Sequence, residues 1–373
     1  MKKIIIVHGW DGASDRDWMP WTTTEFKKLG YEVVCPDLPH TENPTIEDWV
    51  PFLDRIVGTP DQDTYFIGHS IGCQTIMRYL QTINIKVGGA IFVAGWFDLE
   101  NLEGPDAEAI AKPWTETPID TAKVRSNLGF LVTLLGDNDP WVPYEKTKEK
   151  FEKLLGSEVI TIPKGGHITS DDGFGPFNRL IAIAHDRISG IELLEVVNEK
   201  NEVIGLENRK KIHKEGLLHR EIHIWFMTPD RKLIFQHRAK DKDTYPDKLD
   251  ATVGGHVDPG MSYEATALKE ALEETGITLD PAKLKLVKTM PKKSFDEATG
   301  LTNNTLRAQY VYLFDGDIKD LKIETGKAIG FEAWDIDSLP KLSDGDKQKF
   351  IPLILSREFL DLFEQGEKAL GLK

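Results

Sequence analysis

The segment from Gly254 to Ile277 constrains the fold of this chain more than any other part of its sequence. It opens with a glycine pair followed by a histidine and then runs into a stretch that predicts a helix. Offsets of three and four residues place Glu270, Glu273 and Glu274 on one face of that helix. Because three like charges repel one another, the arrangement favours a bound cation. Carboxylate oxygens suit Mg²⁺ or Mn²⁺, so the segment predicts a metal site.

The same segment resembles the Nudix box, whose pattern is G-x5-E-x7-R-E-U-x-E-E-x-G-U, with U an apolar residue. The positions that match are Gly255, Glu270, Ala271, Glu273, Glu274, Gly276 and Ile277. Met261 stands where the family has Glu. Lys269 stands where the family has Arg, which keeps the charge but loses the bidentate fork. An ordinary solvated helix is the alternative, but the glycine turn, the fixed spacing and the terminal glycine argue against it.

The resemblance implies a Nudix fold, which is an α/β/α sandwich around a mixed sheet. It also implies that Glu270, Glu273 and Glu274, together with the carbonyl group of Gly255, hold Mg²⁺ or Mn²⁺. The implied activity is metal-dependent hydrolysis of a diphosphate bond in a substrate of the nucleoside diphosphate-X type. Within the box, Glu273 is the candidate general base, and an acid from a loop such as Glu332 is the alternative.

The flanking segments 216–225, 232–238 and 242–246 resemble the Nudix branch that is close to isopentenyl-diphosphate isomerase. That isomerase has a cysteine directly before the glycine and histidine of the box, where this chain has Gly254. Hydrolysis is therefore expected, and isoprenoid diphosphate isomerisation is a distant alternative. Arg238 and Lys242 are candidates for binding the anionic substrate, although a solvated basic loop accounts for them equally well.

Three histidines of this half are candidates for a remnant metal cluster, because the isomerase uses histidines in comparable segments. They are His219, His223 and His256. Histidines on short strands more often have a structural role, which is the favoured interpretation here.

A second catalytic signature lies in the first half of the chain. The segment Gly68-His-Ser-Ile-Gly72 fits G-x-S-x-G and follows an apolar stretch that predicts a buried strand. Small residues on both sides of Ser70 allow a sharp turn from strand to helix, which presents the serine hydroxyl above the sheet. Upstream, a predicted strand ends in His-Gly, a typical oxyanion-loop position. The backbone N–H groups of Trp10 and Ile71 are therefore the candidate oxyanion donors.

The chain order Ser70, Asp139, His167 matches that of the α/β-hydrolases. A histidine can take the serine proton, and an acid behind it fixes the tautomer and stabilises the imidazolium. Asp137 competes with Asp139 for this role. Asp139 is favoured because it lies directly before Pro140, the position that this loop usually gives to the acid.

The region from Met1 to about Arg187 resembles the small serine hydrolases of the retinoblastoma-binding-protein and YdeN type. The supporting motifs are His8-Gly-Trp-Asp-Gly12, Pro36-Asp-Leu-Pro39, Gly68-His-Ser-Ile-Gly-Cys73, Val93-Ala-Gly-Trp96 and Gly166-His167. The resemblance implies a minimal α/β-hydrolase, with a parallel sheet covered by helices on both faces, that hydrolyses a small ester or amide. His8 and His69 are expected to be structural. Five tryptophans line the site or belong to the core: Trp10, Trp18, Trp21, Trp96 and Trp114.

Length and composition agree with two folded enzymes. The 373 residues suffice for two domains, predicted at residues 1–188 and 191–373 on either side of a Ser-Gly break. The 46 basic and 61 acidic residues give a net charge of −15, which argues against nucleic-acid polymers or an anionic membrane as main partners. Small-molecule substrates are expected instead. Two cysteines, Cys35 and Cys73, suggest reduced thiols and a cytoplasmic setting.

Two hypotheses of another class stay open. In the first, the serine hydrolase half is catalytically silent and acts as a binding module. In the second, the Nudix half senses a nucleotide without cleaving it, which the departures at Met261 and Lys269 would permit. For the second half the sequence also predicts helices at about 262–275 and 347–367, and turns at Asp280-Pro281 and at Pro291.

Overall fold

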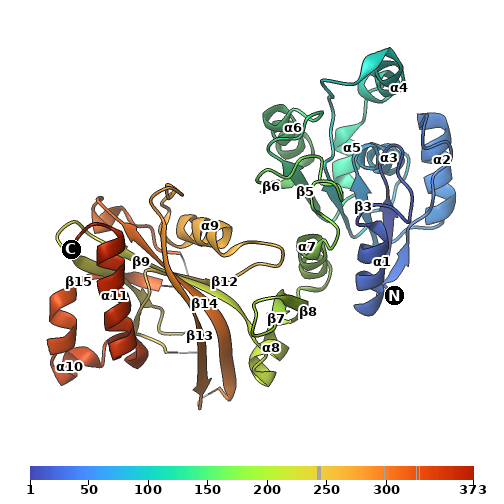
Figure 1. The fold of residues 1–373 in the computed structure, drawn as a ribbon. Helices are drawn as coiled ribbons and strands as arrows, with labels where there is room; N and C mark the ends of the chain where they lie inside the picture. The colour runs from blue at the N-terminus through green and yellow to red at the C-terminus, as the bar shows by residue number, and fades with distance from the viewer. Residues whose placement is uncertain (242–244, 298, 325, 327) are drawn as a thin grey trace. The chain divides into compact units, whose positions relative to one another are not determined.

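The computed structural model describes residues 1–241, 245–297, 299–324, 326 and 328–373. The chain separates into two compact units, Met1–Gly190 and Ile191–Lys373 (Figure 1). Each unit has its own sheet and its own hydrophobic core. In the part of the chain that the structure describes, no helix is long and apolar enough to cross a membrane.

The first unit is built on a six-stranded parallel sheet with the order β2-β1-β3-β4-β5-β6. Its strands are β1 (Lys3–Val7), β2 (Glu32–Val34), β3 (Thr64–His69), β4 (Gly89–Val93), β5 (Leu131–Gly136) and β6 (Glu158–Ile162). Every residue of β3, β4 and β5 is buried, so both faces of the central sheet are covered. This is the pattern expected when crossover helices pack on the two faces of a parallel sheet. The predicted α/β architecture is confirmed.

The connections between these strands are mostly helical. The helices are α1 (Met19–Lys28), α2 (Ile46–Val57), α3 (Ile71–Leu80), α4 (Gly104–Glu116), α5 (Thr121–Ser126), α6 (Tyr144–Lys150), the π-helical turn η1 (Phe151–Leu155) and α7 (Asn178–Ser189). Helix α1 packs with α7, whereas α3 packs with α2 and α5. The helices thus form two groups around the sheet.

The turn from β3 to α3 positions Ser70, and it depends on two glycines. Ser70 has a φ of 53°, which lies in the left-handed region. A Cβ atom on Gly72 would lie 2.4 Å from the carbonyl oxygen of Val7, and one on Gly68 would lie 2.9 Å from the Cα of Cys73. Any side chain at these positions would push α3 away from the sheet, so the tight turn requires glycine at both.

We expect Gly72→Ala to destabilise the first unit by roughly 2 kcal/mol or more, because the added methyl group meets backbone that cannot move aside. Calorimetric scans of the full chain should then show one transition shifted down by roughly 4–8 °C. Gly175→Ala is the matched control, since a Cβ atom there would have nothing within 4 Å among the described residues. Equal melting temperatures for both variants and the wild type would contradict the packing argument.

The second unit is built on a nine-stranded mixed sheet. Along its main path the order is β11-β10-β9-β14-β13, while β12 pairs with β9, β15 with β10, and β7 with both β8 and β9. The strands are β7 (Leu193–Val197), β8 (Val203–Asn208), β9 (His219–Met227), β10 (Lys232–Arg238), β11 (Leu249–Asp250), β12 (Val253–His256), β13 (Lys285–Asp296), β14 (Leu301–Leu313) and β15 (Ala328–Asp335). The pair β9–β14 is parallel, and the other described pairs of this sheet are antiparallel.

Strand β9 divides the core of this unit into two layers because alternate side chains point to opposite faces. Ile222, Ile224 and Phe226 pack in the cluster that includes Ala267 and Ala271 of α9 (Tyr263–Thr275). Trp225 and Met227 pack in the cluster that includes Phe359, Leu362 and Phe363 of α11 (Arg357–Ala369). One helix therefore covers each face of the sheet, and the predicted α/β/α sandwich is confirmed.

The remaining helical segments of the unit are short. They are α8 (Arg209–Glu215), η2 (Ile318–Asp320), η3 (Ile336–Lys341), α10 (Asp344–Lys347) and η4 (Pro352–Leu355), of which η2, η3 and η4 are 3₁₀ turns.

Two predictions about this unit were wrong, and proline explains both. The predicted helix at 347–367 is interrupted, because Pro352 has no N–H to continue a helix and instead begins η4. The predicted turn at Pro291 lies inside β13, paired with Leu306. Strand β13 is the last strand along the main path of the sheet. A proline is tolerated on such an edge strand because its missing N–H is not needed to pair with a further strand.

Candidate active sites

The structure joins His167 to Asp139 at the carboxyl end of the parallel sheet. Nδ1 of His167 lies 2.6 Å from Oδ2 of Asp139, whose side chain is only 2% exposed. The other carboxylate oxygen, Oδ1, accepts hydrogen bonds from the backbone N–H groups of Trp141 and Val142, at 2.9 and 3.1 Å. A carboxylate held this way keeps the proton of the imidazole on Nδ1, so that Nε2 is free to act as a base.

The competing acid, Asp137, serves another purpose. Its Oδ1 accepts a hydrogen bond from the backbone N–H of Lys164 at 2.6 Å. It therefore supports the loop that leads to His167 and does not contact the imidazole through that oxygen. Of the two aspartates left by the sequence analysis, Asp139 is the one that pairs with the histidine.

Ser70 is largely buried, with 8% of its surface exposed. The indole Nε1 of Trp96 lies 3.4 Å from Oγ of Ser70 and donates to it. The sequence analysis had assigned Trp96 no particular role within the set of five tryptophans. The ring of Trp141 packs edge-on to His167, with the ring centroids 5.1 Å apart. The sequence analysis did not identify Trp141. The sole sequence signal for it is its position directly after Asp139-Pro140.

The two predicted oxyanion donors belong to the two segments that meet at Ser70. Ser70 is the N-cap of α3, so the N–H of Ile71 is one of the first helical donors, which have no partner within the helix. A Cβ atom on Gly9 would lie 3.4 Å from the Cβ of Ser70, so the loop that carries Trp10 runs directly beside the serine. The arrangement can place two backbone donors near an oxygen bound at Ser70.

His8 and His69 both bond to backbone groups around this site. Nε2 of His8 accepts from the N–H of Leu38 at 3.0 Å, and its Nδ1 donates to the carbonyl of Gly9 at 2.8 Å. Nε2 of His69 donates to the carbonyl of His167 at 3.0 Å. Burial lowers the pKa of His69 to about 4, so this ring is neutral at neutral pH.

We expect Asp139→Asn to lower kcat/KM for a small activated ester by roughly 10⁴-fold, because the amide cannot hold the required tautomer. Asp137→Asn is the matched control, since an asparagine oxygen can still accept from the N–H of Lys164. Hydrolysis of p-nitrophenyl acetate measures both variants. The assignment fails if Asp137→Asn loses activity and Asp139→Asn retains it.

The first unit should also lose stability at acid pH because of His69. An unfolded histidine binds a proton below pH about 6.5, whereas folded His69 binds one only below pH about 4. The stability contribution is therefore complete above pH about 6.5 and decreases by roughly 3 kcal/mol as the pH falls to about 4. His69→Gln should flatten the dependence of the melting temperature on pH across this window. An unchanged slope would contradict the assignment.

The three box glutamates lie on α9, which begins at the N-cap residue Ser262. Ser262 accepts a hydrogen bond from the N–H of Ala265 and thereby sets the start of the helix. Glu270 and Glu274 are buried, with 6% and 3% of their surfaces exposed, whereas the Glu273 side chain is 48% exposed. The helix thus presents two carboxylates to the sheet and one to solvent.

Strand β12 lies against the two buried glutamates. A Cβ atom on Gly255 would lie 2.6 Å from the carboxyl carbon of Glu270, so only glycine allows this carboxylate to reach the strand. Oε2 of Glu274 accepts from the backbone N–H of Gly254 and from Nε2 of Gln236, each at 3.2 Å. The sequence analysis did not identify Gln236, because this residue lies outside the box. The pairing of strands in the sheet brings it close to Glu274.

Lys269 places its ammonium group among these carboxylates. Its Nζ lies 2.8 Å from Oδ2 of Asp258, 3.1 Å from Oε1 of Glu270 and 3.5 Å from Oε2 of Glu273. Burial by itself would lower the pKa of Lys269, but Glu270 and Asp258 outweigh it and hold the pKa above its ordinary value. Asp258 was not identified from the sequence, since the box pattern leaves its position unspecified.

The other departure from the box has a packing explanation. Met261 is partly buried and packs against the apolar cluster beneath α9. A glutamate there would bring a charge into contact with apolar side chains. The position therefore contributes to the core in this chain and offers no oxygen ligand.

The remaining candidates of this unit are scattered. Nη1 of Arg238 bonds to Oδ2 of Asp250 at 3.0 Å. Lys242 lies outside the described residues. Glu332 is on strand β15 and not in a loop; it accepts from Nε1 of Trp334 at 3.1 Å and lies 3.5 Å from Nδ1 of His237.

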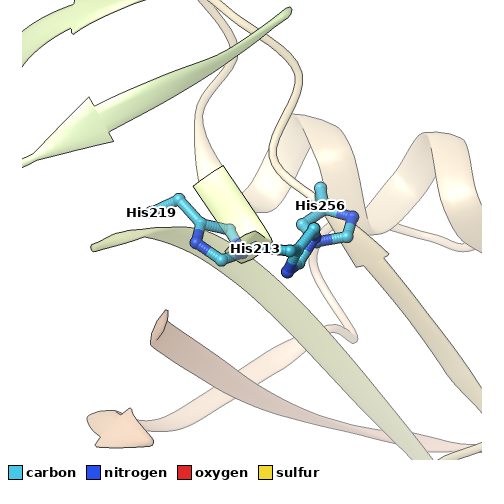
Figure 2. A group of neighbouring side chains, drawn as sticks. All are labelled: His213, His219 and His256. Atoms are coloured by element: carbon cyan, nitrogen blue, oxygen red, sulfur yellow. The ribbon is translucent and has the colours of Figure 1, made fainter. Parts of the chain in front are cut away.

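The histidine cluster differs from the one that the sequence suggested. His219 and His256 lie together, but the third member is His213 on α8 and not His223 (Figure 2). One nitrogen from each of the three rings lies within 4.8 Å of the others. His223 points from the same strand toward a different environment, where its ring packs edge-on to Trp225 at 5.8 Å.

Two solved structures align with parts of this chain. The crystal structure of the ydeN gene product of Bacillus subtilis aligns with a TM-score of 0.47 at 23% identity, covering 51% of this chain and all (100%) of that chain. A crystal structure of a Deinococcus radiodurans protein aligns with a TM-score of 0.34 at 21% identity, covering 47% of this chain and 98% of that chain.

Curated relatives also match one half of the chain each. The putative hydrolase YdeN of Bacillus subtilis is 26% identical over 176 residues, which cover 46% of this chain and 89% of that protein. An uncharacterized Nudix hydrolase of Clostridium acetobutylicum is 29% identical over 156 residues, which cover 41% of this chain and 74% of that protein.

Family models for serine hydrolases and for the NUDIX domain match residues 4–185 and 217–354, respectively. The chain therefore joins a domain of the serine hydrolase family to a NUDIX domain, and both belong to hydrolase families.

Proposed function

We propose that the chain is a bifunctional hydrolase. Residues 191–373 cleave a diphosphate bond in a substrate of the nucleoside diphosphate-X type, with Mg²⁺ or Mn²⁺. Residues 1–188 hydrolyse a small ester or amide. The observation that carries the first activity is the carboxylate of Glu270 against Gly255, where a Cβ atom would lie 2.6 Å from the carboxyl carbon. The residues present fit a hard divalent cation, because the donors are carboxylate and carbonyl oxygens.

Glu270, Glu273, Glu274 and the carbonyl group of Gly255 would hold the ion. When bound, a divalent ion neutralises the diphosphate and lowers the pKa of an attacking water molecule. Two features of the chain position these carboxylates. The first is a pair of hydrogen bonds, from Gln236 and from the N–H of Gly254, that orients Glu274.

The second feature that positions the carboxylates is Lys269, whose ammonium nitrogen lies 3.1 Å from Glu270 and 3.5 Å from Glu273. It keeps two like charges close together before an ion arrives. Lysine does so as a point charge, without the two parallel hydrogen bonds of an arginine. We therefore expect Lys269→Arg to support the activity at least as well as the wild-type residue does.

Glu273 is the best candidate for the general base of this reaction. Its side chain is 48% exposed, so it can reach a water molecule beside the substrate, whereas Glu270 and Glu274 face the strand. Glu332 is less suitable because its carboxylate oxygens already lie beside Trp334 and His237. Arg238 remains a candidate for the diphosphate, which would compete with Asp250 for its guanidinium group.

In the first unit, Ser70 would attack the substrate carbonyl while His167 takes its proton. Asp139 holds the proton on Nδ1 of His167, as the 2.6 Å contact requires. The N–H groups of Trp10 and Ile71 would stabilise the oxyanion of the tetrahedral intermediate. This intermediate would collapse to the acyl-enzyme as His167 gives its proton to the leaving alcohol or amine, and a water molecule would then attack the acyl-enzyme and release the acid.

The first activity is tested with a panel of diphosphate compounds in Mg²⁺, following phosphate or pyrophosphate release. We expect turnover by the wild type, and a loss of roughly 10²-fold or more in the double variant Glu273→Gln, Glu274→Gln, because the amides can neither hold the cation tightly nor act as a base. The matched control is Ser70→Ala, which should leave diphosphate cleavage unchanged.

The same variants separate the two activities from silent alternatives. An active-site phosphonate should label the wild type and not Ser70→Ala; absence of labelling in the wild type would make the first unit a binding module. Substrate-dependent stabilisation of the second unit without turnover across the panel would make it a sensor. Isomerisation of an isoprenoid diphosphate is disfavoured, since the two cysteines, Cys35 and Cys73, both lie in the first unit.

A further inference from the structure

A cavity of about 290 Å³ lies in the first unit, beside helix α3. Gln74 belongs to its lining and follows Ser70 by four residues, a rise of about 6 Å along an α-helix. The rest of the lining comes from the segment after β4, from the end of α4, from the start of α5 and from α6 and η1. None of the three triad residues is among the described residues that line it, so the cavity is separate from the triad.

The amide group of Gln74 has a partner on one side only. Gln74 is 1% exposed, and its Nε2 donates to the carbonyl oxygen of Trp96 at 2.7 Å. This bond identifies the amide nitrogen, because a carbonyl oxygen can only accept. The other amide atom, Oε1, is buried and has no hydrogen-bond partner among the described residues. A buried acceptor without a donor is unfavourable, so a ligand that offers an N–H or O–H group would stabilise this side chain.

Arg78 places a positive charge behind the wall of the cavity. It is 2% exposed, and its Nη2 donates to the carbonyl oxygens of Trp114 and Thr117, each at 2.8 Å. Both of these residues line the cavity. Burial lowers the pKa of Arg78 to about 10, although the charge of Glu47 opposes this, so the guanidinium is still charged at neutral pH. Its Nε has no partner within the described part of the chain.

The outer part of the cavity also has more positive than negative charge. Asp98 and Lys150 line the cavity and form an ion pair, and Asp98 pairs with Lys146 as well, at 2.8 Å. One carboxylate thus lies between two ammonium groups, and the buried Arg78 adds a third positive charge. An anionic group would be attracted to such a site.

The remaining walls are mostly apolar, and two of their aromatic side chains are fixed by packing. The indole Nε1 of Trp114 donates to the carbonyl oxygen of Pro44 at 2.9 Å, and its ring packs edge-on against Trp49. The ring of Phe97 packs against Phe151, with the centroids 4.9 Å apart. The apolar lining residues are Phe97, Trp114, Pro118, Ile119 and Leu154. Walls of this kind suit a flat, apolar ligand.

We propose that this cavity binds a small aromatic carboxylate that carries a hydrogen-bond donor on its ring. The donor would meet Oε1 of Gln74, and the carboxylate would lie beside Lys150, whose side chain is 33% exposed and therefore nearer to solvent. Small-molecule sites begin at about 300 Å³, so one aromatic ring with two substituents suits the space. The ligand would also lie two hydrogen bonds away from Ser70, because Trp96 accepts from Gln74 and donates to Ser70. The proposal does not depend on ester hydrolysis.

The test measures binding of 4-hydroxybenzoate to the full chain by titration calorimetry. We expect a Kd below about 1 mM, and roughly tenfold weaker binding of benzoate, which lacks the hydroxyl donor. Gln74→Met should weaken 4-hydroxybenzoate binding by roughly tenfold and leave benzoate binding unchanged, because only the first ligand uses the acceptor. Lys150→Met should weaken both ligands. Lys148→Met is the matched control, since this lysine is on the same helix and outside the cavity lining.

Amide chemical shifts of the wild type locate the bound 4-hydroxybenzoate. The largest changes are expected in residues 115–121, next to the cavity, and not in residues 139–141, next to His167. Thr115→Trp adds bulk at an exposed lining position and should abolish binding, which provides a second variant in case Gln74→Met does not fold. The proposal is overturned by absence of binding, by benzoate binding as tightly as 4-hydroxybenzoate, by shift changes centred on residues 139–141, or by binding that survives Thr115→Trp.

Discussion

Both candidate sites depend on positions where the backbone leaves no room for a side chain. At Gly72, a Cβ atom would lie 2.4 Å from the carbonyl oxygen of Val7, so helix α3 can sit directly on strand β1. At Gly255, a Cβ atom would lie 2.6 Å from the carboxyl carbon of Glu270, so helix α9 can sit directly on β12. In each unit the missing methyl group allows a helix to bring its reactive side chain to the edge of a strand. The chemistry of Ser70 and of the box glutamates follows from these two close approaches.

Buried charge is the second requirement, and each unit meets it with backbone donors. Both oxygens of Asp139 are engaged, one by His167 and the other by two N–H groups. Glu274 is held by the N–H of Gly254 and by Gln236. Such bonds offset part of the cost of removing a carboxylate from water. Ionised carboxylates are what a triad and a cation site both need.

The departures from the Nudix box have different physical consequences. Met261 exchanges a charge for apolar packing beneath α9, so the site has one carboxylate fewer to offer a cation. Lys269 preserves positive charge among Asp258, Glu270 and Glu273. The carboxylates are therefore still grouped around a positive charge, the ammonium group of Lys269. They are one fewer than the family pattern provides. Directly beside it, β12 ends in His256, whose ring lies in a cluster of three imidazoles. Neighbouring residues of one strand thus face carboxylates on one side and imidazoles on the other.

Local sequence determined the elements whose formation depends on nearby residues. The strand–turn–helix around Ser70, the capped helix α9 and the two-unit division follow from glycine positions, apolar periodicity and a Ser-Gly break, which act over a few residues.

Tertiary structure alone decided which distant groups meet. Asp139 and not Asp137 reaches His167 because two loops at the ends of β5 and β6 cross there. His223 shares a face of β9 with His219 but lies four residues further along the strand, where its ring packs against Trp225. The cluster instead includes His213, which α8 brings to His219 from outside the strand. Contacts across tens of residues depend on register and packing, which no short pattern encodes.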